Sequence, residues 1–175
     1  MPLDLLPVRE DSPLLENVMP LYLRAFPENE RRPLDTLLRD KTGAGEVFAA
    51  CEGDCFVGLA ILLTWRDITH ILYFAVMEEL RGRGYGGEIL RRISDLPPSH
   101  RIIADIEEPF DGAANRLQRE RRMAFYARNG FGPTEIRYTW RDERYIILST
   151  GIPVTGEEFH QFWNYFYSQN AGYNY

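Results

Sequence analysis

The stretch "RGRGYGGEIL", which begins at Arg81, carries the residues whose types and spacing most clearly predict chemistry. Gly82, Gly84 and Gly87 spell G-x-G-x-x-G, the fingerprint of a dinucleotide-binding loop. Arg81, Gly84 and Gly86 spell a different phosphate-binding loop, R-x-x-G-x-G. In both interpretations the glycines let a phosphate approach the backbone N–H groups at the positive end of a helix dipole. The two patterns predict different cofactors, and the surrounding chain must separate them.

The surroundings of the loop disfavour the dinucleotide interpretation. A dinucleotide fold needs its first glycine directly after a strand, repeated strand–helix units, and an acidic residue about 20 residues further on. Asp105 lies 23 residues after Gly82 and meets the last demand. Five residues, "MEELR", nevertheless separate the strand end "FAV" from Gly82, and hairpins rather than strand–helix units flank the motif. The R-x-x-G-x-G pattern is therefore favoured.

Hydrophobic periodicity and turn residues predict the elements that must position this loop. We expect one domain over residues 1–175, of the α+β (layered α/β) class, with a central mixed, largely antiparallel twisted sheet of about six to seven strands. The C-terminal helix has a capping box of Thr155 and Glu158 and an aromatic stripe, while Pro20 predicts a kink or two short helices. The expected helices are 12–26, 31–41, 86–96, 113–131 and about 155–170, and the expected strands are 46–65 (a hairpin), 70–76, 101–107, 134–140 and 144–150.

Two motifs in this order resemble the GNAT superfamily of N-acetyltransferases. The segment "FAVMEELRGRGYGGEIL" is similar to the central motif of that family, and "AFYARNGF" is similar to its Y-x-x-x-G-F signature, with Tyr126, Gly130 and Phe131 in place. The resemblance covers about residues 46–148. Where many members carry asparagine and alanine before the tyrosine, this chain has Arg119 and Arg122, so a coenzyme contact from that turn is in doubt.

The resemblance implies that the loop binds the pyrophosphate of coenzyme A. It also implies that the backbone of the strand end contacts the pantetheine arm and that an N–H there polarises the thioester carbonyl. The expected cofactor-binding residues are Phe74, Ala75, Val76, Arg81, Gly82, Arg83, Gly84, Tyr85, Gly86 and Gly87. Acetyl-CoA is then the co-substrate, and no metal is expected.

The implied reaction is acetyl transfer from acetyl-CoA to an amine by direct attack in a ternary complex. Tyr126 is the candidate acid for the leaving thiolate. The candidate bases are His70, on the predicted strand, and Glu107 and Glu108, which close the next strand; Glu107 and Glu108 would alternatively attract an ammonium group. An amine that loses its proton to bulk water needs no dedicated base.

Composition excludes few other functions. The net charge of −6 disfavours a nucleic-acid partner, and the absence of a long apolar run or a signal-peptide pattern predicts a cytoplasmic protein with no membrane association. Cys51 and Cys55 are expected to be small core residues of a hairpin. The acceptor is expected to be a small-molecule or peptide amine, and the sequence leaves open whether the chain forms a homodimer. A non-catalytic acyl-CoA-binding module and a transferase for a longer acyl-CoA remain alternatives.

Overall fold

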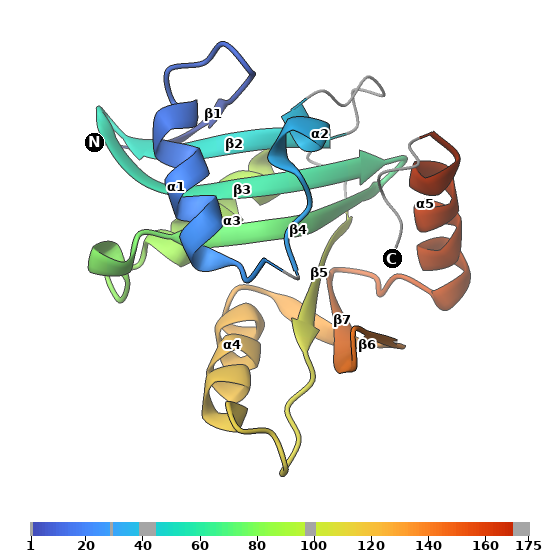
Figure 1. The fold of residues 1–175 in the computed structure, drawn as a ribbon. Coiled ribbons are helices and arrows are strands. Elements are labelled where there is room, and N and C mark those ends of the chain that lie inside the picture. Colours follow the sequence, from blue (N-terminus) through green and yellow to red (C-terminus); the bar gives the residue numbers. More distant parts are fainter. Residues whose placement is uncertain (1, 29, 39–44, 97–100, 170–175) are drawn as a thin grey trace. The chain divides into compact units, whose positions relative to one another are not determined.

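The computed structural model describes residues 2–28, 30–38, 45–96 and 101–169. Their strands form a seven-stranded sheet in the order β1-β2-β3-β4-β5-β7-β6 (Figure 1). This agrees with the expected α+β class. The strands are β1 Leu3–Pro7, β2 Gly45–Glu52, β3 Cys55–Trp65, β4 Ile68–Val76, β5 Arg101–Glu107, β6 Phe131–Trp140 and β7 Glu143–Thr150. The helices are α1 Leu15–Ala25, α2 Leu34–Leu38, the short 3₁₀ helix η1 Glu78–Leu80, α3 Tyr85–Asp95, α4 Arg116–Arg128 and α5 Gly156–Gln169.

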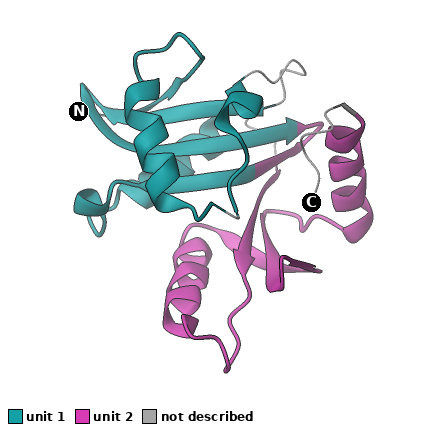
Figure 2. Cartoon of the chain, in the orientation of Figure 1, with its two compact units in different colours: residues 1–64, 71–98 teal, residues 65–70, 99–175 magenta. Residues whose placement is uncertain are grey.

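Contacts divide the chain into two compact units, shown in different colours in Figure 2. Unit 1 comprises residues 1–64 and 71–98 and holds β1, β2 and most of β3 and β4. In Figure 1 helix α1 crosses one face of these strands and α3 lies on the other face. Both helices carry buried apolar side chains, so the sheet of unit 1 is covered on both faces (Figure 1). They are Val18 and Leu21 of α1 and Ile89, Leu90 and Ile93 of α3.

Unit 2 comprises residues 65–70 and 99–175 and holds β5, β6, β7, α4 and α5. Strand β7 pairs antiparallel with β5 on one side and with β6 on the other. The predicted aromatic stripe of α5 supplies core residues, since Phe162 and Phe166 are fully buried and Trp163 is 5% exposed. Burial of large aromatic rings of this kind is the main source of stability for a small layer.

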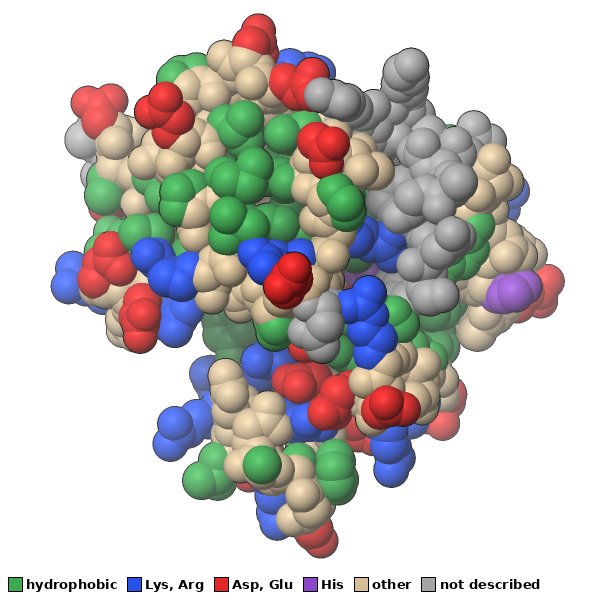
Figure 3. Space-filling model, viewed as in Figure 1, with side chains coloured by type: hydrophobic (Ala, Val, Ile, Leu, Met, Phe, Trp, Pro, Cys, Tyr) green, Lys and Arg blue, Asp and Glu red, His purple; other side chains and the backbone are tan. Residues whose placement is uncertain are grey.

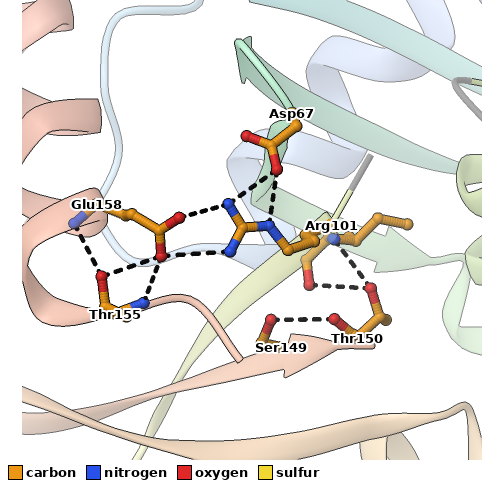
Figure 4. Close-up of polar contacts among 7 residues, drawn as sticks. Asp67, Arg101, Ser149, Thr150, Thr155 and Glu158 are labelled. Carbon is orange, nitrogen blue, oxygen red and sulfur yellow. Dashed lines mark hydrogen bonds and ion pairs between the residues drawn. The ribbon is translucent and has the colours of Figure 1, made fainter. Parts of the chain in front are cut away.

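An ion-pair network in unit 2 connects the first turn of α5 to the beginning of β5 (Figure 4). The predicted capping box is present, because Thr155 N donates to Glu158 Oε2 at 2.8 Å and Glu158 N donates to Thr155 Oγ1 at 3.3 Å. The same Glu158 carboxylate accepts from Arg101 at 2.7 Å, and Arg101 also pairs with Asp67 at 2.8 Å. The hydrogen bond from Arg101 and the contacts with Thr155 lower the pKa of Glu158 to about 2.

Three features differ from the sequence-based expectation. Strand β1 was not expected; it pairs antiparallel with β2. Helix α1 continues through Pro20 as one helix, so of the two expected alternatives, a kink or two short helices, the second is wrong. The two cysteines are both free, and Cys51 is buried as expected, but Cys55 is exposed. The two do not face each other, because Cys51 lies opposite Phe56 while Cys55 lies opposite Glu52. The expected stop of α3 at Pro97 and Pro98 lies outside the described residues.

Candidate active site

The glycine-rich loop of unit 1 folds into the N-terminus of α3. Gly84 is the N-cap residue, with φ +89° in the left-handed region that favours glycine, and Gly82 has φ +76°. The first helical hydrogen bond runs from Glu88 N to Gly84 O at 3.2 Å. The N–H groups of the three residues before Glu88 therefore precede the intrahelical ladder. A Cβ at Gly82 or Gly84 would meet nothing within 4 Å, so the backbone is open to an approaching anion.

Two side-chain hydrogen bonds connect this loop to other parts of unit 1. Arg81 Nε donates to Val76 O, 3.3 Å away, which connects the loop to the end of β4. The Tyr85 hydroxyl donates to Glu52 Oε2 at 2.8 Å, at the turn between β2 and β3. The hydrogen bond to Glu52 is the main cause of the raised pKa of Tyr85. Sequence reasoning did not single out Glu52, because a contact between a hairpin turn and a helix start leaves no local signal.

Gly58 of β3 makes a close approach to the end of β4, the expected thioester-binding strand. A Cβ at Gly58 would lie 2.4 Å from Ala75 O and 3.2 Å from Val76 Cα. The pairing of β2 with β3 shifts register between Ala50 and Cys51, immediately beside this contact. A glycine is therefore required here by space, and it fixes the backbone of Ala75 and Val76.

Tyr126, the candidate acid, lies on α4 in unit 2. Its side chain is 6% exposed, and its ring meets Phe125 and Phe131 edge-on at 5.4 and 5.1 Å. Its hydroxyl has no hydrogen bond to any other residue that the structure describes. Burial raises the pKa of Tyr126, and the nearby Asp105 carboxylate raises it further against the opposing charge of Arg122. The phenol therefore stays protonated at neutral pH, as a proton donor must.

His70, a candidate base, is fully buried and is hydrogen-bonded to Asp105 of β5. Its Nε2 lies 2.7 Å from Asp105 Oδ1, and Tyr138 donates its hydroxyl to Asp105 Oδ2 at 2.5 Å. Rings of α5 surround the imidazole, with Trp163 edge-on at 5.4 Å and Phe162 at 6.0 Å. Burial raises the pKa of Asp105, but its contacts with His70 and Tyr138 lower it, and the net shift is downward.

Glu107 and Glu108, the other candidate bases, are both engaged by arginines. Glu107 accepts from Arg122 at 2.7 Å and pairs with Arg119 at 3.4 Å. Glu108 pairs with two arginines of the β6–β7 hairpin, Arg137 at 3.0 Å and Arg144 at 2.7 Å. Figure 3 shows acidic and basic side chains interspersed over the part of the surface that belongs to unit 2. A substrate ammonium at either glutamate would have to compete with two guanidinium groups.

Arg119, which stands where many relatives of the suggested family carry asparagine, has a structural role here. It is 4% exposed, and its guanidinium donates to Asn115 Oδ1 at 2.6 Å and Glu143 Oε2 at 2.8 Å. A third bond of 3.3 Å reaches Glu108 O. These contacts join α4 to β5 and β7 within unit 2.

Within unit 2 the structure brings several predicted residues near one another and adds two that were missed. Asp105 and Tyr138 were not site candidates, yet Asp105 joins His70 to Tyr138 by hydrogen bonds and Tyr126 by charge. The available signal was an acidic residue inside the otherwise apolar "RIIADI", where a buried strand ordinarily carries none. Among the described residues there is no group of three or more metal-binding side chains, and no helix there is long and apolar enough to cross a membrane.

Comparison with known proteins identifies the family. The model of the acetyltransferase (GNAT) family matches residues 15–131, which is more than half of the chain. The chain belongs to the GNAT acetyltransferase family. None of the curated proteins matches it by sequence. Membership implies acyltransferase chemistry, without specifying an acceptor.

Solved structures of other GNAT proteins share the fold. A protein described as a GNAT-family acetyltransferase from Bacteroides thetaiotaomicron matches with a TM-score of 0.75 at 21% identity, over 90% of this chain and 92% of that one. Naa50 of Arabidopsis thaliana, in complex with the bisubstrate analogue CoA-Ac-MVNAL, matches with a TM-score of 0.64 at 20% identity, over 87% of this chain and 100% of that one. A GNAT acetyltransferase of Elizabethkingia anophelis with acetyl-CoA bound matches with a TM-score of 0.56 at 16% identity, over 86% of this chain and 98% of that one.

Proposed function

We propose that this GNAT protein transfers the acetyl group of acetyl-CoA to an amine in a ternary complex. The observation that carries the proposal is the loop before α3, where Gly84 caps the helix in a left-handed conformation and leaves the first-turn N–H groups ahead of the helical ladder. Such a helix start is suited to a pyrophosphate. The exposed side chains of Arg81 and Arg83 supply further positive charge for phosphate groups.

The end of β4 is proposed to hold the reacting end of the cofactor. Main-chain groups of Phe74 and Val76 would contact the pantetheine arm, and an N–H near Ala75 or Val76 would polarise the thioester carbonyl. The contact with Gly58 supports this role, because it fixes the position of that backbone. A bound bisubstrate conjugate of CoA and a peptide in Arabidopsis Naa50 supports direct transfer within this family.

The chemical step needs one acid and one proton acceptor. The lone pair of the neutral amine attacks the thioester carbonyl carbon, the C–N bond forms, and the C–S bond breaks with its electron pair on sulfur. Tyr126 is proposed to give its proton to that thiolate and to regain one from solvent. The proton lost by the amine goes to His70, Glu107, Glu108 or bulk water, and His70 would have to act through Asp105, because it is fully buried.

The test is a turnover screen with acetyl-CoA over polyamines, aminoglycosides, amino acids and peptide N-termini, following the release of free thiol. Acceptor-dependent thiol release is the expected result. Tight binding of acetyl-CoA without transfer to any acceptor would contradict the enzymatic proposal and support a non-catalytic binding module. Faster turnover of a longer acyl-CoA would overturn the assignment of acetyl as the transferred group.

A further inference from the structure

Residues 30–33, here the α1–α2 segment, form no helix or strand, yet two tyrosine hydroxyls hold their backbone. Tyr22 of α1 donates its hydroxyl to Arg32 O at 2.8 Å. Tyr73 of β4 donates its hydroxyl to Glu30 O at 2.8 Å. Arg32 N donates to both hydroxyls, at 3.1 Å to Tyr22 and 3.0 Å to Tyr73. Four hydrogen bonds therefore fix three backbone groups of the segment.

Both tyrosines are themselves fixed, because they lie in an aromatic cluster of unit 1. Tyr22 is 1% exposed and Tyr73 is 7% exposed, and their rings meet edge-on at 5.0 Å. The Phe26 ring packs against both, at 5.6 Å from Tyr22 and 4.9 Å from Tyr73. Burial is the main cause of the strongly raised pKa of Tyr22, so its hydroxyl stays protonated and remains a donor. Buried hydroxyls require partners, and here the backbone of the segment supplies them.

The α1–α2 segment is held beside the end of β4, which is proposed to bind the thioester. Tyr73 precedes Ala75 by two residues, which is about 7 Å along a strand, and their side chains share one face. Further along, Arg24 in the last turn of α1 donates to Met77 Sδ at 3.7 Å. In Figure 1 the chain that leads into α2 passes beside β4. The segment and the end of α1 therefore lie on the face of β4 that carries Tyr73 and Ala75.

The proposed position of coenzyme A leaves this face of β4 for the amine. The pyrophosphate site is the start of α3, and α3 lies on the opposite face of the sheet of unit 1 from α1 (Figure 1). Both reactants must meet at the thioester carbonyl carbon, so the amine arrives from the side that the cofactor does not fill. On that side the α1–α2 segment is next to the reacting end of β4, and its position sets the room for an acceptor.

We propose that Tyr22 and Tyr73 are positioning residues that set the width of the acceptor entrance by holding the α1–α2 segment against β4. The inference rests on the proposed function, since it concerns the acceptor of the same reaction. Neither tyrosine touches the reacting atoms in this proposal, because both hydroxyls are engaged by the backbone of the segment. A fixed segment favours slender, unbranched amines over broad ones, whereas a released segment would admit both.

The first experiment compares two primary amines in the thiol-release assay. Both n-butylamine and cyclohexylmethylamine present a CH₂–NH₂ group, but they differ in width, and the wild type should prefer n-butylamine. Tyr73→Phe keeps the ring and loses two hydrogen bonds, so it should reduce this preference in kcat/KM by about 10-fold and leave the KM for acetyl-CoA unchanged. Tyr22→Phe should act in the same direction. Tyr165→Phe, whose hydroxyl makes no hydrogen bond with any described residue, is the matched control and should keep the wild-type preference.

An unchanged preference in Tyr73→Phe would overturn the proposal. An equal loss for both amines together with a raised KM for acetyl-CoA would show a general structural role and overturn it as well.

The second experiment measures hydrogen exchange at the Arg32 amide and needs no turnover. That N–H donates to both hydroxyls, so it should exchange about 10-fold faster when Tyr22→Phe and Tyr73→Phe are combined, and at the wild-type rate in Tyr165→Phe. An unchanged rate in the combined variant would show that the hydroxyls do not hold the segment and would overturn the proposal. No thiol release by the wild type with any acceptor would refute the proposed function instead, while hydrogen exchange would still decide whether the two tyrosines fix the segment.

Discussion

Replacement of Gly58 by alanine tests whether the backbone at the end of β4 binds the thioester. The new Cβ would lie 2.4 Å from Ala75 O, where ordinary contact begins at 3.4 Å, so one strand must move by about 1 Å. Both nearby groups of Ala75 and Val76 are backbone and cannot rotate away. Overpacking of this kind costs about 1–3 kcal/mol of stability. A displacement of about 1 Å at a reacting group lowers kcat/KM by roughly 100-fold.

The assay is steady-state thiol release with acetyl-CoA as the varied substrate, together with thermal unfolding. Gly132→Ala is the matched control, because Gly132 is also in a strand and its Cβ would meet nothing within 4 Å. The control should keep nearly wild-type kinetics. If Gly58→Ala unfolds at a lower temperature but retains the wild-type kcat/KM for acetyl-CoA, the strand end does not position the thioester, and the reasoning is refuted.

Three further perturbations test other parts of the site. Tyr126→Phe should lower kcat by about 10²- to 10⁴-fold with acetyl-CoA affinity nearly unchanged in calorimetry, and an unchanged kcat would remove its acid role. Tyr85→Phe loses the hydrogen bond to Glu52 and should raise the KM for acetyl-CoA by roughly 2- to 10-fold without changing kcat. An unchanged KM would show that this bond does not position the loop. Glu158→Gln should unfold more easily than the wild type near pH 7. Because folding lowers the Glu158 pKa from 4.5 to about 2, the difference in stability between variant and wild type should shrink as the pH falls from 4.5 to about 2. A difference in denaturant unfolding that stays constant over this pH range would exclude the ion pair with Arg101 as its cause.

The features that were predictable from the sequence are those that local signals determine. The loop before α3 depends on its own glycines and on the helix that follows, and the capping box of Thr155 and Glu158 lies within one helical turn. Strand β1 has no such signal, because "LDLLP" becomes a strand only by pairing with β2, which lies more than 40 residues further along the chain. Its existence is a tertiary effect.

The centre of unit 2 was missed for the same physical reason. His70 and Asp105 are 35 residues apart in the chain, and Asp105 and Tyr138 are 33 residues apart. Sequence reasoning could place His70 on a strand, but it could not see that burial would prevent the imidazole from meeting a substrate directly. Nor could it see that Glu107 and Glu108 would each meet two arginines, since those arginines come from α4 and from the β6–β7 hairpin.

Arg119 and Arg122, which depart from the family pattern, pair with Glu107 at the acidic end of β5. Two adjacent carboxylates at a strand end repel each other and lose solvation when a helix covers them. In this chain α4 supplies cations to Glu107 from the two positions where many relatives carry asparagine and alanine. Once those arginines are bound to Glu107, the remaining acid of β5 is Asp105, whose partners are His70 and Tyr138. The acids that the sequence singled out at this strand end are therefore engaged within the protein by arginines of α4 and of the β6–β7 hairpin.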